Sequence, residues 1–273
     1  PPVIGSFNQQ AVIVDEDILR HFDADFRVLY AQDGNQWAAG PDGFVRDEYG
    51  IDYKLSPDGF YYDFAKHPLA EADLNTIEKY TFSDPKAEHR VSGIEERINQ
   101  FGNEYALVLE WSRDSVFGAS SWLRGLENFF MDLADDSPIA DAIMDKVTDH
   151  QIAVFDFILG RFGKHIDVVR IGDDLGSQNG LLISPNTYRR KVKPRHARLV
   201  QAIKERAECK VVIHSCGAIR EILPDFIEIG IDAVNPVQVT CEGMDPAGLK
   251  KEFGKKLTFW GGGVDTQHVL CQA

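Results

Sequence analysis

The sequence predicts an α/β fold in which helices cover both faces of a parallel sheet. Two observations favour this fold. From residue 104 onward, short apolar runs rich in β-branched residues alternate with longer amphipathic stretches, and the runs are nearly continuous, as in strands buried on both faces. A doubly wound open sheet is the alternative, but no glycine-rich phosphate turn follows any of the runs.

The expected elements follow one another along the chain with marked boundaries. Strands are predicted at residues 105–109, 167–171, 210–213, 232–235 and 256–260. Helices are predicted at residues 121–134, 138–162, 185–205, 218–229 and 246–253. Ser184-Pro185 and Asp245-Pro246 are typical N-caps followed by proline, and Gly230 and Gly254 occupy C′ positions. An earlier unit predicts a helix at residues 15–22 and a strand at residues 26–30.

Residues 37–64 interrupt this alternation. Aromatic residues alternate around Asp-Gly turns in this range, which predicts an antiparallel excursion. The whole pattern contains about six parallel strands, and a closed (β/α)8 barrel needs about two more. We therefore expect a single TIM-type barrel domain over residues 1–273 that is incomplete in this chain, with its opening and closing strands missing.

Composition limits the classes of function. The chain has 273 residues, 44% of them hydrophobic, and a formal net charge of −14. Its acidic residues are spread along the sequence, which argues against nucleic acid and anionic membranes as partners. No apolar run approaches the ~20 residues that a membrane span needs, and no leader pattern opens the chain, so we expect a cytoplasmic location. The four cysteines lack the spacing of a disulfide framework, which leaves them free as thiols.

The run from Lys210 to Gly217 ends in a candidate metal-binding pair, His214 and Cys216. Residues two apart on a strand point the same way, so an imidazole and a thiolate would reach one point in space. Both are ligands that suit zinc, and a single pair at a strand end is more typical of a catalytic site with an open position than of a structural site. A buried histidine beside an inert cysteine is the alternative interpretation.

Other polar residues also follow the predicted strands, where a parallel α/β barrel collects its functional groups. They are Glu110, Asp173, Asp174, Asn235, Gln238 and Trp260. Asp173 and Asp174 are candidates for supplying or receiving a proton, and Gln178 is a candidate for orienting a polar ligand. The aspartates have a structural alternative, a solvated turn or helix cap, and so does Trp260, a packing role. His196 is expected at the surface or an interface.

Four groups of residues, taken together, point to a family. They are Gly172-Asp-Asp-Leu-Gly176 with Ile183-Ser-Pro185, His214-Ser-Cys-Gly217, Asn235-Pro-Val-Gln238 with Gly243-Met-Asp-Pro246, and Phe259-Trp-Gly-Gly262 with Val264-Asp-Thr266. From about Ile13 to its end, the chain resembles the uroporphyrinogen decarboxylase superfamily, and most of all its cobalamin-dependent, corrinoid-linked methyltransferase branch. The resemblance implies a TIM-type barrel.

The two branches of that superfamily differ in their binding residues. True decarboxylases bind a tetrapyrrole through arginines of a Met-Arg-Gln-Ala-Gly-Arg segment that this chain lacks, and carry Phe-Asp-Ser where this chain has Gly172-Asp-Asp174. The methyltransferases hold zinc with a His-x-Cys pair, matched here by His214 and Cys216, and a distant third cysteine near the closing strand. Cys241 or Glu110 is available as the third ligand, and a residue beyond the end of the chain is the remaining alternative.

The resemblance implies a zinc-dependent methyltransferase that moves a methyl group between a methylated small molecule or thiol and a corrinoid protein. Zinc would act as a Lewis acid, Asp173 or Asp174 as proton donor or orienting group, and Gln178, Asn235, Gln238 and Trp260 as pocket residues. The corrinoid cofactor would be carried by the partner protein. A decarboxylase-like lyase acting on a tetrapyrrole is the alternative, and a non-catalytic barrel that binds a tetrapyrrole or a corrinoid protein is another.

Overall fold

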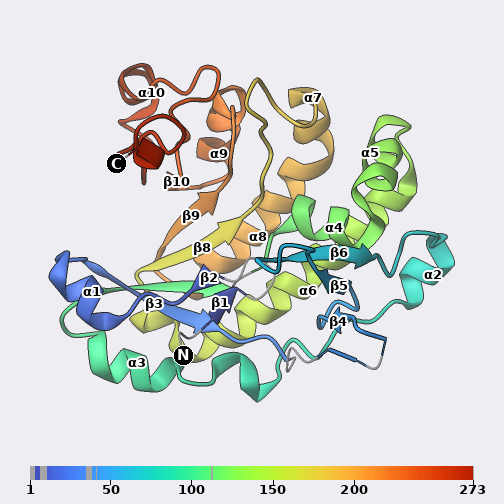
Figure 1. Cartoon of the computed structure of the whole chain (residues 1–273), viewed down its shortest axis with the longest axis horizontal. Coiled ribbons are helices and arrows are strands. Elements are labelled where there is room, and N and C mark those ends of the chain that lie inside the picture. The colour runs from blue at the N-terminus through green and yellow to red at the C-terminus, as the bar shows by residue number, and fades with distance from the viewer. Residues whose placement is uncertain (1–3, 7–10, 35–38, 41, 112, 273) are drawn as a thin grey trace. The chain divides into compact units, whose positions relative to one another are not determined.

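The computed structural model describes residues 4–6, 11–34, 39–40, 42–111 and 113–272 (Figure 1). The chain divides into two compact units, which we describe separately. Unit 1 comprises Pro1–Ser112 and Ser120–Ile143, and unit 2 comprises Arg113–Ala119 and Met144–Ala273. The single barrel domain over residues 1–273 stays a prediction.

Unit 1 contains a parallel strand pair and a separate antiparallel sheet. Strand β3 (Phe26–Ala31) pairs in parallel with β7 (Ala106–Trp111) along its whole length. Strands β4 (Val45–Arg46), β5 (Asp52–Leu55) and β6 (Tyr62–Lys66) form a three-stranded antiparallel sheet. This sheet confirms the predicted antiparallel excursion, although Trp37, where the predicted range begins, lies outside the described residues. The remaining strands, β1 (Ile4–Ser6) and β2 (Ala11–Val12), pair antiparallel.

Helices of unit 1 follow amphipathic patterns. In α3 (Ile94–Phe101) the buried residues Ile94, Ile98 and Phe101 recur at the spacing of one helical face. The sequence analysis missed this helix, α2 (Leu74–Lys79) and the 3₁₀ turn Glu88–Val91. Of the other helices, α1 (Glu16–His21) and α5 (Leu126–Ala134) belong to unit 1, and α4 (Val116–Arg124) and α6 (Pro138–Phe162) contribute residues to both units.

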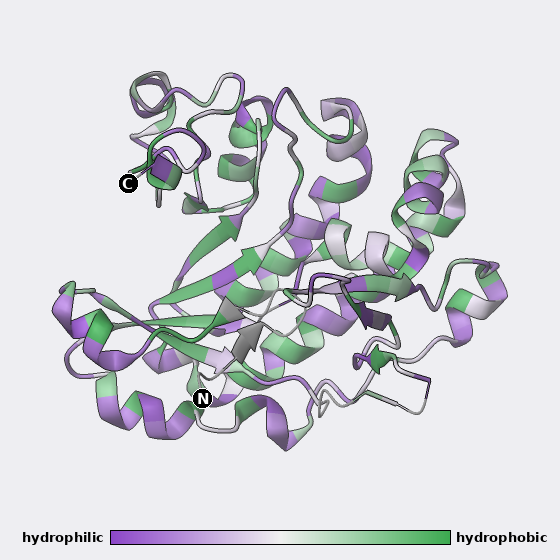
Figure 2. Ribbon diagram, viewed as in Figure 1, coloured by the Kyte–Doolittle hydropathy of each residue, from purple (hydrophilic) through white to green (hydrophobic). Residues whose placement is uncertain are grey.

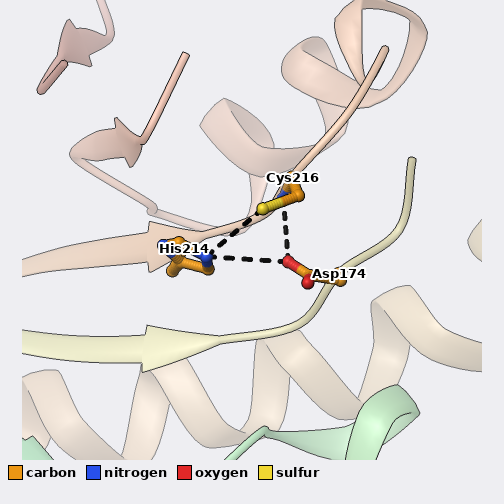
Figure 3. A group of neighbouring side chains, drawn as sticks. All are labelled: Asp174, His214 and Cys216. Atoms are coloured by element: carbon orange, nitrogen blue, oxygen red, sulfur yellow. Dashed lines mark hydrogen bonds and ion pairs between the residues drawn. The ribbon is translucent and has the colours of Figure 1, made fainter. Parts of the chain in front are cut away.

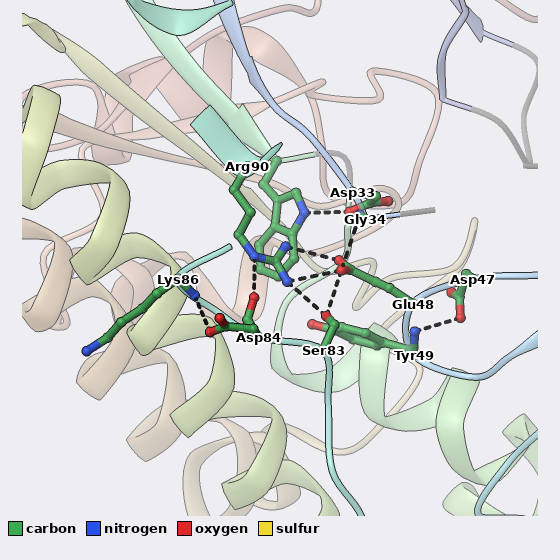
Figure 4. Close-up of polar contacts among 10 residues, drawn as sticks. Asp33, Gly34, Asp47, Glu48, Tyr49, Ser83, Asp84, Lys86 and Arg90 are labelled. Atoms are coloured by element: carbon green, nitrogen blue, oxygen red, sulfur yellow. Dashed lines mark hydrogen bonds and ion pairs between the residues drawn. The ribbon is translucent and has the colours of Figure 1, made fainter. Parts of the chain in front are cut away.

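A buried ion pair ties three segments of unit 1 together (Figure 4). Arg90 and Glu48 have side chains 0% and 1% exposed and lie 3.0 Å apart. The guanidinium also donates to the Ser83 hydroxyl and, at 3.0 Å, to the Asp84 main-chain oxygen. Burying opposite charges is tolerated only when both are paired and hydrogen-bonded. The contacts therefore fix the segment before α3 to the β4–β5 turn.

Unit 2 is built on four parallel strands in the order β11-β10-β9-β8. Their bounds are β8 (Val168–Gly172), β9 (Lys210–His214), β10 (Ala233–Asn235) and β11 (Thr258–Phe259). Both central strands are rich in buried apolar residues, and Figure 2 shows them largely in the hydrophobic colour; these residues are Val168, Val169 and Ile171 of β8 and Val211, Val212 and Ile213 of β9. All the predicted strands are present, so the α/β class with a parallel sheet is confirmed. The sheet is open, because β11 pairs with β10 alone among the described strands.

The helices of unit 2 confirm most of the predicted starts. Helix α6 has the predicted bounds, and so does α10 (Pro246–Phe253). Ser184 and Asp245 cap their helices by accepting bonds from the main chain of Thr187 and Gly248. Gly230 has a φ of +90° past the end of α9 (Leu223–Glu228). Gly254 differs from the expectation: it is the C-cap of α10 with a right-handed φ of −64°.

Two predicted helices are divided in the structure, each at an identifiable residue. Residues 121–134 break at Gly125, whose φ of +85° cannot continue a right-handed helix and separates α4 from α5. Residues 185–205 form α7 (Pro185–Thr187), a π-helical turn (Tyr188–Val192) and α8 (Lys193–Arg206). Pro194 has no amide hydrogen for the regular helical bond, and the π turn ends two residues before it.

Short 3₁₀ turns complete unit 2, at Gly163–His165, Arg220–Ile222 and Leu270–Gln272. Among the described helices, none combines the length with the apolar character that crossing a membrane requires.

Candidate metal centre

Strand register brings the candidate residues of unit 2 to one edge of the sheet. Gly172, the last residue of β8, pairs with His214, the last residue of β9, and His214 pairs with Asn235, the last residue of β10. Parallel strands all end at the same edge. The loops that carry Asp174, Cys216 and Gln238 therefore begin side by side.

Three potential ligand atoms converge at this edge (Figure 3). The Nε2 atom of His214 lies 3.5 Å from Sγ of Cys216 and 3.7 Å from Oδ1 of Asp174. All three ligand atoms lie within 4.8 Å of one another, and among the described residues they are the group of three or more that could hold a metal ion. The side chains of His214 and Asp174 are 27% and 51% exposed, so the group is open to solvent.

Hydrogen bonds orient the imidazole of His214. Its Nδ1 atom lies 2.6 Å from Oδ1 of Asn235, whose amide nitrogen donates to the main-chain oxygen of Trp260 at 3.0 Å. Because Asn235 Nδ2 is the donor to Trp260, its Oδ1 is an acceptor, and His214 must carry its proton on Nδ1. Nε2 is then free to bind a cation, which is the usual arrangement at histidine ligands.

The loops after β8 and β9 cross in direct backbone contact. A Cβ atom on Gly217, which has a φ of +88°, would overlap the backbone of Gly176. Glycine at both positions lets Asp174 Oδ1 accept a hydrogen bond from the Cys216 amide at 2.9 Å. Gly217 donates in turn to Oε1 of Gln238 at 2.7 Å. The glycines of two sequence motifs therefore position the carboxylate beside the thiol.

Asp173 and Asp174 have contrasting surroundings. The Asp173 side chain is 0% exposed and accepts hydrogen bonds from the amides of Phe117 and Gly118 at 2.8 and 2.6 Å, and from Nε2 of His196 at 2.6 Å. Asp174 is half-exposed and faces His214 and Cys216. Of the two aspartates that were predicted to supply or receive a proton, Asp174 is therefore the one beside the candidate ligands. The oxygens of Asp173 instead accept hydrogen bonds within the protein.

The prediction that His196 lies at the surface or an interface is wrong. Its side chain is 0% exposed, because it lies on the inner side of α8 and contacts Asp173. Helices that cover a sheet bury one face, and His196 belongs to that face.

Asp114 is a candidate that the sequence analysis missed. Its Oδ1 lies 3.6 Å from the point that a Cβ would occupy on Gly172, the strand partner of His214. Burial, followed by the charges of Asp173 and Asp174, raises the pKa of Asp114 well above its usual range. The Gln151 side chain donates to its main-chain oxygen at 2.9 Å. A clue was available, since Asp114 follows a strand, but β7 extends to Trp111 and the loop begins later than predicted.

The Cys216 thiol has a strongly altered acidity. Burial, followed by the charge of Asp174, raises the pKa of Cys216 to about 12. In the absence of a cation the thiol is therefore protonated at neutral pH, and binding as a thiolate requires release of that proton.

The remaining predicted residues of unit 2 lie in the loops that follow its strands and do not join this group. The Cys241 Sγ atom contacts the side-chain oxygens of Gln178 and Gln238 at 3.5 and 3.6 Å, and Gln178 also donates to the main chain of Thr240. These contacts join the loops after β8 and β10. Trp260 follows β11 and bonds through its amide to Val234. Glu110 lies on β7 in unit 1. The ligand roles of Cys241 and Glu110 stay predictions.

Comparison with known families decides the classification. The sequence pattern described as "Uroporphyrinogen decarboxylase (URO-D)" matches residues 47–271. The chain belongs to the uroporphyrinogen decarboxylase family. The predicted family is thus confirmed, and the match contains all the residues of the candidate metal centre.

Two relatives indicate the branch of the uroporphyrinogen decarboxylase family. The chain is 32% identical over 116 residues to "Methylated-thiol--coenzyme M methyltransferase" of Methanosarcina mazei, a match that covers 42% of this chain and 29% of the relative. The solved structure of a methyltransferase from Methanosarcina mazei shares the fold, with a TM-score of 0.56 and 15% identity over 78% of this chain and 59% of that one. The chain therefore spans well under two thirds of each relative.

Proposed function

We propose that this chain is the catalytic barrel of a zinc-dependent methyltransferase that moves a methyl group between a methylated small molecule or thiol and a corrinoid protein. The convergence of Asp174, His214 and Cys216 at the carboxyl edge of the sheet is the observation that supports it most. The methyltransferase names of both relatives support the same reaction class. A cytoplasmic location is part of this proposal.

The donor atoms of the group and the distance between Cys216 and His214 fit zinc. Tetrahedral zinc with bonds of about 2.0 Å to nitrogen and about 2.3 Å to sulfur separates those two ligand atoms by about 3.5 Å. Sγ of Cys216 and Nε2 of His214 are 3.5 Å apart. One nitrogen, one sulfur and one carboxylate oxygen leave a fourth position open, as in catalytic zinc sites. We therefore propose Asp174, in place of Cys241 or Glu110, as the third ligand.

The proposed roles of the surrounding residues follow from what each side chain contacts. Bound zinc would supply Lewis acidity to the sulfur or oxygen that gains or loses the methyl group. A thiol must lose its proton before it accepts a methyl group. In the opposite direction, loss of the methyl group leaves a thiolate, which must gain a proton. Asp114, a carboxyl whose pKa burial raises well above its usual range, is the proposed group for this proton exchange. Asn235 orients His214, and Gln178 and Gln238 support the loops beside it.

A tetrapyrrole lyase fits this edge less well. Its substrate carries several carboxylates and requires cationic side chains for recognition. The described edge of unit 2 presents the carboxylate of Asp174 and the side-chain amides of Asn235 and Gln238 beside His214 and Cys216. An acidic edge repels a polycarboxylate, so we retain methyl transfer as the proposal.

Zinc content and methyl transfer test the proposal together. We expect about one zinc per chain in protein purified without chelator, and transfer of a methyl group from methylcobalamin to coenzyme M, followed by the cobalamin spectrum. His214→Ala and Cys216→Ser should remove both. Cys209→Ser is the matched control, because Cys209 precedes β9 at the opposite end from His214, and it should change neither. Stoichiometric zinc in both site variants would disprove the assignment.

A further inference from the structure

A buried chain of hydrogen bonds leads from α8 to the loop that carries Asp174. The Tyr188 hydroxyl lies 3.3 Å from Nδ1 of His196, and Nε2 of His196 lies 2.6 Å from Oδ2 of Asp173. Tyr188 is 1% exposed, and His196 and Asp173 are 0% exposed. None of the three side chains reaches the solvent-open ligand group, so the catalytic proposal above leaves them unexplained.

The hydrogen-bond chain has one consistent direction. The Asp173 side chain accepts from the amides of Phe117 and Gly118, and as a carboxylate it also accepts from His196, which therefore carries its proton on Nε2. Nδ1 of the neutral imidazole is then an acceptor, and the Tyr188 hydroxyl donates to it. Every polar atom of the imidazole is thereby satisfied, as a buried side chain requires. The direction fixes the tautomer and the ring orientation of His196.

Asp173 forms hydrogen bonds with three other segments of unit 2. Its oxygens accept from Phe117 and Gly118 at the start of α4 as well as from His196. Its own amide donates to the main-chain oxygen of His214 at 2.8 Å. One side chain and its backbone thus connect the end of β8, the end of β9, α4 and α8. Charge-assisted bonds of this kind are shorter and stronger than neutral ones.

We propose that His196 and Tyr188 are positioning residues of the metal centre, which act through Asp173 to set where Asp174 and His214 present their ligand atoms. The inference rests on the proposed zinc site. Asp174 is half-exposed, and beyond its contacts with His214 and the Cys216 amide its location depends on the backbone that Asp173 anchors. Partners behind metal ligands typically change affinity by about 10- to 100-fold when removed.

The test compares metal binding in purified variants of His196 with metal binding in a control variant that is also destabilised. His196→Leu removes both hydrogen bonds, and His196→Gln keeps a donor that can reach Asp173. Leu199→Ala, on the same helix and also buried, lowers stability without touching the hydrogen-bond chain. Zinc affinity is measured by competition with a chromophoric chelator, and the ligand field by the visible spectrum of bound Co²⁺. All measurements are made well below the melting temperature of each variant.

We expect His196→Leu to weaken zinc binding by about 10-fold or more and to alter the Co²⁺ spectrum. His196→Gln should restore most of the affinity, and Leu199→Ala should lower the melting temperature with unchanged affinity and spectrum. Wild-type zinc affinity and Co²⁺ spectrum in His196→Leu would overturn the inference and leave His196 a packing residue.

Tyr188→Phe provides a second test if His196→Leu does not fold. It removes the bond that fixes the tautomer of His196 and should weaken zinc binding several-fold, whereas unchanged affinity would contradict the inference. Failure of the proposed function is distinguishable, because wild-type protein would then bind no zinc dependent on His214 and Cys216. Failure of this inference alone leaves wild-type binding intact.

Discussion

Asp173 and Asp174 are adjacent in the chain, but their side chains have different surroundings. Asp173 is surrounded by donors in the protein interior, and Asp174 shares the solvent-open edge with an imidazole and a thiol. Successive residues of an extended segment point in opposite directions. The same two-residue motif can therefore anchor a loop with one carboxylate and present a ligand with the other.

Replacing each aspartate by asparagine should separate these two tasks. Asp173→Asn places an amide NH2 against donors that need an acceptor, so we expect a loss of about 2–3 kcal/mol in the free energy of unfolding. Asp174→Asn removes an anionic ligand from an exposed position, so zinc affinity should fall with little change in stability. Urea denaturation and zinc competition on both variants measure the two effects. Zinc affinity falls in Asp173→Asn as well if Asp173 anchors the ligands, so stability separates the two aspartates, and equal losses in the free energy of unfolding would contradict the division.

Asp114 makes the stability of the metal-free protein pH-dependent. Its folded-state pKa is raised well above the ordinary value, so the folded state holds a proton that the unfolded state releases. Its contribution is therefore fully present below the ordinary aspartate pKa and is lost as pH rises toward the folded-state value. Asp114→Asn should raise the melting temperature relative to wild type, with a gain that grows from pH 4 to pH 8 in chelator.

Asp58→Asn serves as the control of opposite sign. Hydrogen bonds from the Ser56 hydroxyl and the Phe60 amide lower the pKa of Asp58, so its removal should lower stability at neutral pH and matter less in acid. A gain for Asp114→Asn that is constant with pH would show that its carboxyl titrates alike in both states.

At the scale of elements, the register of the parallel strands determines the site. Gly172, His214 and Asn235 are strand ends paired with one another, and the chemistry follows in their loops. These strand ends could be predicted because near-continuous apolar runs stop abruptly at polar residues. The breaks in the helices were harder to predict, since Gly125 and Pro194 act through backbone geometry that hydrophobic periodicity does not report.

The Arg90–Glu48 pair is the element-scale test of unit 1. Arg90→Met leaves the Glu48 carboxylate buried without its cation, so we expect a loss of about 3–5 kcal/mol in the free energy of unfolding. Arg206→Ala is the control, because it removes a pair with Asp156 that is exposed on both sides and should cost less than about 1 kcal/mol. If chemical denaturation gives equal losses in the free energy of unfolding for both variants, burial does not determine how much the Arg90–Glu48 pair contributes to stability.

At the scale of the whole molecule, the sequence was informative about the family and about two residues of the candidate metal centre. His214 and Cys216 are two residues apart on an extended segment, so their convergence was predictable from sequence alone. Asp174 was predicted at the same edge because it also follows a strand, whereas Asp114 and His196 reach this region from other segments, with partners 20 or more residues distant in the chain. Such convergence depends on strand order and loop crossing, which one sequence does not specify.

We propose that one histidine, one cysteine and one aspartate hold the metal. X-ray absorption at the zinc edge of the zinc-loaded protein, free of substrate thiol, measures this ligand set directly. We expect one sulfur at about 2.3 Å and nitrogen or oxygen ligands at about 2.0 Å in the wild type, and the same sulfur signal in Cys241→Ser. Two sulfur ligands in the wild type, one of them lost in Cys241→Ser, would contradict Asp174 as the third ligand and restore Cys241.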